Sequence, residues 1–243
     1  MKHWGITDRG NVRTQNQDYY TIVRFSPEHT LAVVCDGMGG AKAGNIASRL
    51  ATEVFVEEVK RTWSEKLDRD ALRRMMLDAV ELANQAVYEN SQLSEDYTGM
   101  GTTLVAVLVA GNMAIAVNVG DSRAYLLRTR GIQQITEDHS VVQMMVRRGD
   151  ITEEEARTHP GKNLITRAIG TEKRVACDIF TLRLEQGDAI LLCSDGLSNL
   201  LSDQELLFEV VHAVHKERCC QRLIDMAKDR GAPDNVTAVL LFV

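Results

Sequence analysis

Five short apolar runs in this chain each end or begin at an aspartate, and this recurrence constrains the fold more than any other feature. Apolar runs lead into Asp36, Asp121 and Asp195 in LAVVCDGMGG, AIAVNVGDSR and AILLCSDGL. Asp18 and Asp234 instead precede apolar runs, in RTQNQDYY and APDNVTAVLLFV. Such a run predicts a strand buried on both faces, and an unpaired charge at its end is costly to bury.

A single Asp-Gly pair after a strand is most simply a turn, and Asp36-Gly37 alone indicates no more than that. Five such junctions favour a second interpretation, in which the strand ends converge and gather the carboxylates. Gathered carboxylates repel one another unless a cation lies among them or some of them keep their protons. Oxygen ligands suit hard divalent ions such as Mg²⁺ and Mn²⁺, and no His/Cys cluster competes for zinc or copper. Spacing alone leaves the convergence open.

Hydrophobic periodicity divides the chain into strands, two helices, strands, two helices and a final strand. Pairs of long helices between groups of strands favour helices layered on antiparallel sheets, an α+β fold. With 3 prolines and no linker, the sequence predicts one domain over residues 1–243. The expected strands cover 19–25, 30–35, 103–110, 113–119, 123–128, 179–184, 189–193 and 235–243. The expected helices cover 45–61, 70–90 and 140–148, with others starting at 152 and 202 and a last one reaching 230.

Composition argues against several classes of function. The net charge is −6, the pI is near 5.6 and Lys and Arg form no block, so the basic surface of a nucleic-acid binder is missing. The start MKHWGITDRG contains no apolar signal sequence, and the longest strongly apolar run, LVAVLVA, is too short to span a bilayer. Five cysteines without a Cys-x-x-Cys pair fit reduced thiols better than disulfides or a zinc site. We therefore expect a cytoplasmic protein.

Seven short motifs, taken in order and spacing, resemble the metal-dependent serine/threonine protein phosphatases of type 2C. They are RTQNQD, CDGMGG, MGTTL, GDSRAY, DHS, CSDGL and PDNVT. The similarity runs from about Gly5 to Val243 and is closest to the compact bacterial members. The resemblance implies a four-layer α-β-β-α sandwich, with two central antiparallel sheets flanked by helices. It also implies a cleft at one end of the sandwich that holds two tightly bound Mn²⁺ or Mg²⁺ ions and a third, weaker one.

The resemblance assigns roles to individual residues of the motifs. Asp36 would bridge the two metals, and the carbonyl group of Gly37 would bind one of them. Asp195 and Asp234 would complete the ligands of the other metal. Asp18 would act mainly through a metal-bound water.

Two further residues match positions around the substrate. Asp121 matches the position that holds the third metal together with Asp195. Arg13 matches the arginine that binds the substrate phosphate, and its planar fork of donors suits phosphate oxygens. Two divalent ions lower the pKa of a shared water enough to form hydroxide, which would attack phosphorus without a phospho-enzyme. Gly39 and Gly40 would leave room for metal and phosphate beside the backbone.

The chain departs from the family pattern at one point of chemical importance. Relatives commonly carry a histidine where this sequence has Met38 or Ala41, so a histidine general acid is not expected here. We interpret a metal-bound water as the proton donor to the leaving oxygen. His139 is an alternative, but a lone histidine at a helix start is more often structural. Cys177 and Arg183 match the C-x5-R spacing of cysteine-dependent phosphatases, yet a strand would separate them by roughly 20 Å.

The predicted activity is hydrolysis of phosphoserine and phosphothreonine in proteins by a hydroxide activated at a binuclear Mn/Mg centre. The expected partners are phosphorylated proteins, among them a bacterial Ser/Thr kinase that this monomeric enzyme would oppose. Residues 135–170 resemble the family's flap, which we expect to influence substrate choice. A first rival is a pseudophosphatase that binds without turnover, which the intact Asp36, Asp195, Asp234 and Arg13 disfavour. A second is a phosphatase dedicated to one partner switch, which the lack of an appended sensor domain disfavours.

Overall fold

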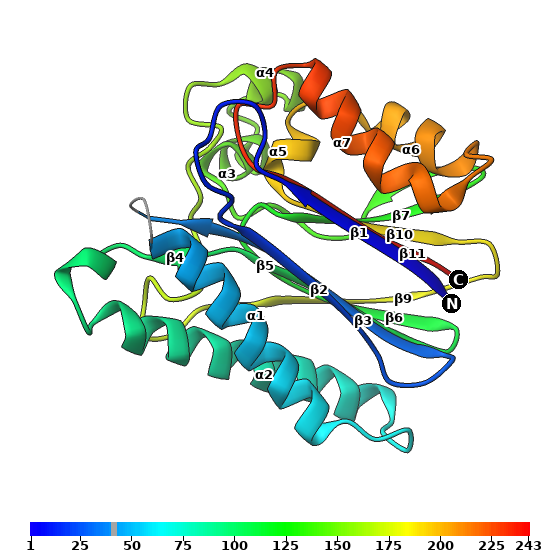
Figure 1. Ribbon diagram of the computed structural model, residues 1–243, viewed down its shortest axis with the longest axis horizontal. Helices are drawn as coiled ribbons and strands as arrows, with labels where there is room; N and C mark the ends of the chain where they lie inside the picture. Colours follow the sequence, from blue (N-terminus) through cyan, green and yellow to red (C-terminus); the bar gives the residue numbers. More distant parts are fainter. Residues whose placement is uncertain (40–42) are drawn as a thin grey trace.

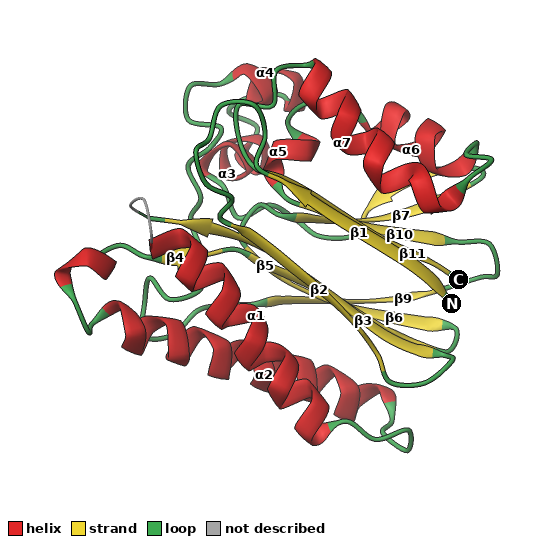
Figure 2. Ribbon diagram, in the orientation of Figure 1, coloured by secondary structure: helices red, strands yellow, loops and turns green. Residues whose placement is uncertain are grey.

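The computed structural model describes residues 1–39 and 43–243, whose elements form four layers (Figures 1 and 2). Two antiparallel sheets lie face to face in the centre. Helices α1 (Ala43–Thr62) and α2 (Arg69–Ser91) cover the outer face of one sheet, and α6 (Asp203–Val211) and α7 (Cys219–Asp229) cover the outer face of the other. This α-β-β-α sandwich confirms the predicted fold class. Among the described residues, no helix combines the length and apolarity needed to cross a membrane.

All strand pairs in both sheets are antiparallel. The first sheet has the order β2-β3-β5-β6-β9, with the short β4 beside β3, and the second has the order β1-β11-β10-β7-β8. In the first sheet the bounds are β2 Asp18–Arg24, β3 His29–Met38, β4 Gly101–Thr102, β5 Leu104–Ala110, β6 Met113–Val119 and β9 Asp178–Arg183. In the second they are β1 Lys2–Asp8, β7 Arg123–Arg128, β8 Gly131–Gln134, β10 Ala189–Cys193 and β11 Val236–Phe242.

The helices begin and end at residues suited to those positions. The structure also contains the short helices α3 (Val141–Arg148) and α4 (Glu153–Thr158), between β8 and β9, and α5 (Asp195–Ser198), after β10. Thr152 with Glu155, and Ser202 with Glu205, form the capping boxes expected from their sequence spacing. Gly149 ends α3 with a φ of 77°, a left-handed conformation that glycine adopts without a steric penalty.

Three apolar layers fill the spaces between the four layers of secondary structure. Alternate residues of β3 face different layers: Leu31 and Val33 pack toward α1 and α2, whereas Ala32 and Val34 pack toward the other sheet. Because successive side chains of a strand point to opposite faces, a strand between two cores must be apolar throughout. This explains the continuous apolar runs of the sequence.

The structure also contains elements that the periodicity did not predict. Strand β3 continues to Met38 instead of ending at 35, because β4 pairs with it through Gly37↔Thr102 and Met38↔Gly101. Strands β1, β4 and β8 were not expected, since none of them has a long apolar run. Asp195 starts the short helix α5 and not a simple turn.

Candidate metal centre

The register of the first sheet brings two of the candidate aspartates together. Asp18, the first residue of β2, lies directly opposite Asp36 of β3. Residues opposite each other in an antiparallel pair place their side chains on the same face, with Cβ atoms about 5 Å apart. Asp36 therefore occupies a paired strand and not a turn, which corrects the simplest interpretation of Asp36-Gly37.

The other candidate aspartates reach the same end of the sandwich from the second sheet and from a connection between the sheets. Asp195 lies two residues after β10, and Asp234 lies two residues before β11, the strand that pairs with β10 through Cys193↔Ala238. Asp121 lies in the connection from β6, in the first sheet, to β7, in the second. The aspartates of both sheets thus lie at the same end of the sandwich.

The ionisation of these carboxyl groups shows that they influence one another. Burial first, and then the charges of Asp195 and Asp234, raise the pKa of Asp18 to about 7, against hydrogen bonds from Thr237 and Ser194 that lower it. Burial raises the pKa of Asp121 to about 8, with Asp195 the next cause. The pKa of Asp36 lies well above its ordinary value, again through burial first and then through the other four carboxylates. Burial and the charge of Asp234 also raise the pKa of Asp195, which a hydrogen bond with Asp36 partly offsets.

Hydroxyl groups from the second sheet hold one oxygen of Asp18. Ser194 Oγ donates to Asp18 Oδ2 at 2.7 Å, and Thr237 Oγ1 donates to the same oxygen at 2.6 Å. The other oxygen, Asp18 Oδ1, is buried without a hydrogen-bond partner. The two hydroxyls fix one oxygen of the carboxyl group and leave the other oxygen unpartnered. Sequence reasoning missed both residues, although Ser194 precedes Asp195 and Thr237 lies in the PDNVT motif.

The backbone of Asp36 is fixed by the MGTTL motif. Its amide donates to Thr103 Oγ1 at 2.9 Å, and its carbonyl oxygen accepts from Thr102 Oγ1 and from the Thr103 amide, each at 2.8 Å. Thr103 Oγ1 in turn lies 2.7 Å from Ser122 Oγ, beside Asp121. The peptide groups that carry Asp36 are therefore hydrogen-bonded on both sides, so its position is well defined.

The donor chemistry of the cluster fits a hard divalent cation. Asp18 Oδ1 and Asp195 Oδ1 are both buried carboxylate oxygens without a partner, and such atoms are costly to bury unless something pairs with them. No group of three or more Asp, Glu, His or Cys side chains within residues 1–39 and 43–243 is arranged to hold an ion as it stands. Asp234 Oδ2 is engaged by Arg13 Nη2 at 2.8 Å.

Arg13 lies at the rim of this cluster. Its side chain is 53% exposed, and within residues 1–39 and 43–243 its ion-pair partner is Asp234; the charges of Asp36 and Asp195 also act on it. These carboxylates raise the pKa of Arg13, the hydrogen bond with Asp234 being the largest cause. The arginine is thus held beside the candidate metal-binding carboxylates. Its contact with Asp234 uses one of its guanidinium nitrogens.

His139 is the alternative to water as the general acid. His139 is buried, its Nδ1 accepts from the Gly120 amide at 3.1 Å, and its Nε2 lies 3.3 Å from Asp178 Oδ2 and 3.1 Å from Arg167 Nη1. With both ring nitrogens engaged, the side chain has the surroundings of a structural histidine. Gly40 and Ala41, named in the sequence analysis, lie outside the described residues.

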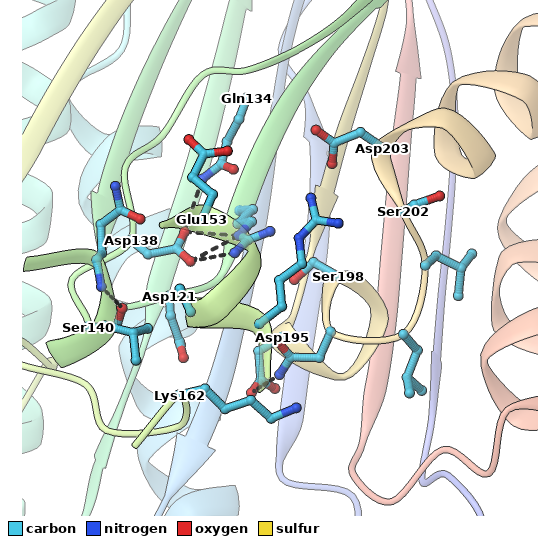
Figure 3. A pocket seen from close by; sticks show the side chains of 18 of the residues that line it. Asp121, Gln134, Asp138, Ser140, Glu153, Lys162, Asp195, Ser198, Ser202 and Asp203 are labelled. Carbon is cyan, nitrogen blue, oxygen red and sulfur yellow. Dashed lines mark hydrogen bonds and ion pairs between the residues drawn. The ribbon is translucent and has the colours of Figure 1, made fainter. Parts of the chain in front are cut away.

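A cleft of about 480 Å³ opens beside the carboxylates (Figure 3). Asp121 and Asp195 lie at one end of it. Ser140 and Lys162, from the segment expected to be a flap, line the cleft, and so does the turn between α5 and α6, with Ser198 and Ser202. The cleft gives a substrate chain room to lie next to the candidate metal site.

Comparison with known proteins identifies the family. The family model described as Protein phosphatase 2C matches residues 9–228. The chain belongs to this family. This protein phosphatase 2C member is 35% identical to the serine/threonine phosphatase stp of Listeria monocytogenes, over 97% of this chain and 93% of that one. It is therefore a metal-dependent serine/threonine protein phosphatase.

Solved structures agree with the family assignment. The serine/threonine phosphatase Stp1 from Staphylococcus aureus superposes with a TM-score of 0.94, at 38% identity over 100% of this chain and 94% of that one. The catalytic domain of the phosphatase PstP, solved with 2 manganese ions, superposes with a TM-score of 0.84, at 36% identity over 98% and 96% of the two chains.

The raised pKa values predict how the stability of the metal-free phosphatase depends on pH. The folded-state pKa values of Asp18, about 7, and Asp121, about 8, lie above the ordinary value of 3.8. Between about pH 4 and pH 8 the unfolded chain thus loses protons that the folded chain keeps, so stability falls as pH rises. Thermal unfolding in EDTA should give a lower Tm at about pH 8 than at about pH 5, and added Mn²⁺ should raise the Tm most at the higher pH. A Tm in EDTA that rises over this range would contradict the prediction, and Asp18→Asn should flatten the slope.

Proposed function

We propose that this phosphatase hydrolyses phosphoserine and phosphothreonine in proteins with two divalent cations, Mn²⁺ or Mg²⁺, and that it opposes a Ser/Thr kinase. The observation that carries the proposal is that five carboxylates lie together at one end of the sandwich. Two of them have buried oxygens without a hydrogen-bond partner. In this proposal the ligands are Asp36, the Gly37 carbonyl, Asp195 and Asp234. Asp18 contributes through water, and Asp121 contributes to a third, weaker ion.

Bound divalent ions supply an acidified water and positive charge beside the phosphate. The side chains of the protein have other tasks. Arg13 binds and orients phosphate oxygens through its guanidinium, which Asp234 holds at the rim of the cluster. Ser194 and Thr237 orient Asp18, and the absence of a histidine at position 38 leaves proton delivery to the leaving oxygen to water.

The relatives support the finer parts of the proposal. The PstP structure with 2 manganese ions supports two ions. We propose that the enzyme is monomeric and cytoplasmic. The net charge of −6, without a basic block, argues against nucleic acid as its substrate. We also propose that residues 1–243 form one catalytic domain, with 135–170 as a flap that lines the cleft.

The experiment that tests this proposal measures phosphate release from a phosphothreonine peptide and from an autophosphorylated Ser/Thr kinase. Both substrates should turn over with Mn²⁺ or Mg²⁺, lose turnover in EDTA and regain it when metal is restored. Turnover that survives EDTA would overturn the metal mechanism. Binding of either substrate without turnover would favour the pseudophosphatase, and turnover of one phosphoprotein but of no peptide would favour the dedicated partner switch.

A further inference from the structure

Asn235 joins the strand end that carries Asp234 to a distant segment of the chain. Its side chain is 3% exposed and makes three hydrogen bonds, all to backbone groups of residues 9–17. Nδ2 donates to Arg9 O and to Gln15 O, each at 2.9 Å, and Oδ1 accepts from the Gln17 amide at 2.8 Å. Both amide hydrogens are used, so the orientation of the side chain is fixed by its partners.

The segment that Asn235 binds is the one that carries Arg13. Residues 9–17 contain neither helix nor strand, and residues 11–15 are exposed. The two carbonyl groups bound by Asn235 Nδ2 belong to Arg9 and Gln15, one on each side of Arg13. Among the described residues, no backbone hydrogen bond is made by the amides of residues 12–14. The shape of the loop around Arg13 therefore depends on its anchors. Asn11 hydrogen-bonds Ala232 O and Lys228 O before the arginine, and the side-chain amide of Asn235 binds carbonyl groups on both sides of it.

Asn235 also contacts the two other segments that supply candidate ligands. Its backbone amide donates to Asp234 Oδ1 at 2.8 Å. Its carbonyl oxygen packs so closely against Gly196, the residue after Asp195, that a Cβ atom there would collide with it. One buried residue thus links the segments that carry Arg13, Asp195 and Asp234.

We propose that Asn235 is a positioning residue that sets where the Arg13 guanidinium lies relative to the bound phosphate. This inference rests on the proposed role of Arg13 in phosphate binding. It requires the amide group specifically, since two carbonyl oxygens need donors and one backbone amide needs an acceptor. In Asn235→Asp the acceptor for Gln17 remains, but an oxygen replaces the nitrogen that faces Arg9 O and Gln15 O, so both hydrogen bonds to these carbonyl groups are lost.

A double-mutant cycle between Asn235 and Arg13 tests the inference. The variants are Asn235→Ala, Asn235→Asp, Arg13→Ala and the two double variants, measured for kcat/KM on a phosphothreonine peptide and for the inhibition constant of inorganic phosphate. When Arg13 is present, each Asn235 substitution should raise the phosphate inhibition constant by about tenfold. In the Arg13→Ala background the same substitution should change it by less than about twofold, because a residue that acts through Arg13 has nothing left to position. Mn²⁺ affinity, measured by calorimetry, should stay within about threefold in Asn235→Ala, which leaves every proposed ligand in place and adds no charge.

Asn84 provides a matched control. It is 2% exposed and makes the same three kinds of hydrogen bond, with Nδ2 donating to Glu172 O and Lys173 O and Oδ1 accepting from the Gly170 amide. Asn84→Ala should lower the Tm as much as Asn235→Ala does and leave the phosphate inhibition constant within about twofold of the unsubstituted protein. A general loss of stability is thereby separated from a loss of positioning.

Each outcome decides between the inference and the proposal beneath it. If Arg13→Ala leaves the phosphate inhibition constant unchanged, the proposed role of Arg13 is wrong. If Arg13→Ala raises it and the Asn235 variants do not, the inference is wrong. The inference is also wrong if the Asn235 substitutions raise the phosphate inhibition constant equally with and without Arg13. It is wrong as well if they lower Mn²⁺ affinity but leave the phosphate inhibition constant unchanged at saturating Mn²⁺. Should Asn235→Ala not fold, the nearly isosteric Asn235→Asp carries the same comparison.

Discussion

Replacing Asp36 by Asn will abolish most of the activity while leaving the metal-free protein as stable as before, or more stable. The carboxyl group of half-buried Asp36 is desolvated and is repelled by Asp18, Asp195, Asp121 and Asp234, and both effects raise its pKa, desolvation the more. Removing that charge relieves repulsion in the folded state but also removes the proposed bridging ligand. We expect kcat/KM on a phosphothreonine peptide to fall about 10³-fold or more, equivalent to about 4 kcal/mol. The Tm in EDTA should stay the same or rise.

Asp188→Asn is the matched control for this prediction. Asp188 is a buried aspartate, 4% exposed, but it pairs with Arg128 and lies beside the start of β10, whereas Asp195 follows the other end. Removing its charge should leave the arginine without its partner and lower the Tm, with little effect on kcat/KM. An Asp36→Asn protein that keeps activity within about tenfold of the unsubstituted enzyme would exclude Asp36 as the bridging ligand.

Gly37→Ala should impair both folding and catalysis, although it adds a single methyl group. A Cβ atom at this position would lie 2.7 Å from Gln17 O and still closer to Gly44 O. Both are backbone atoms, which cannot rotate away as a side chain would. Either β3 or the start of α1 must move, so we expect a loss of at least about 2 kcal/mol in the free energy of unfolding. Because Asp36 and the Gly37 carbonyl move with the strand, kcat/KM should fall about 100-fold.

Gly161→Ala serves as the comparison for Gly37→Ala. The nearest atom to an added Cβ there is His159 Nδ1, at 3.3 Å, which belongs to a side chain that can shift. Unfolding free energy should change by less than about 1 kcal/mol, as is usual for Gly→Ala at a compatible site. Denaturant unfolding and Mn²⁺-dependent turnover of both variants check the prediction. If Gly37→Ala behaves like Gly161→Ala, the close approach of β3 and α1 has no importance for the site.

The sequence allowed the layers and the aspartates to be predicted because both depend on local pattern. Continuous apolar runs require strands covered on two faces, and long helices in pairs require a sheet to cover. The juxtaposition of Asp18 and Asp36 could not follow from pattern alone, since it depends on the register of β2 against β3. Resemblance to a family supplied that juxtaposition, and the strand pairing gives its physical basis.

Other features of the site depend on contacts between residues far apart in the chain. The ion pair between Arg13 and Asp234 spans 221 positions, and the hydrogen bonds from Asn235 span 218 to 226. No periodicity in the sequence signals such contacts. Strand β1 escaped prediction for a related reason: it is held by pairing with β11 at the other end of the chain and not by an apolar pattern of its own.

The layer of side chains between the two sheets has a consequence for the metal site. Asp18 and Asp36 belong to one sheet, whereas Asp195 and Asp234 flank strands of the other, so the gap between the two pairs depends on how thick that layer is. On one side it consists of small residues such as Ala32, Val107 and Ala116, and on the other of larger ones such as Ile190 and Leu192. A larger side chain in this layer would push the two sheets apart. The distance between the two pairs of aspartates would then increase, although the substituted residue contacts none of them. The spacing of the proposed metal ligands is therefore a property of the hydrophobic interior.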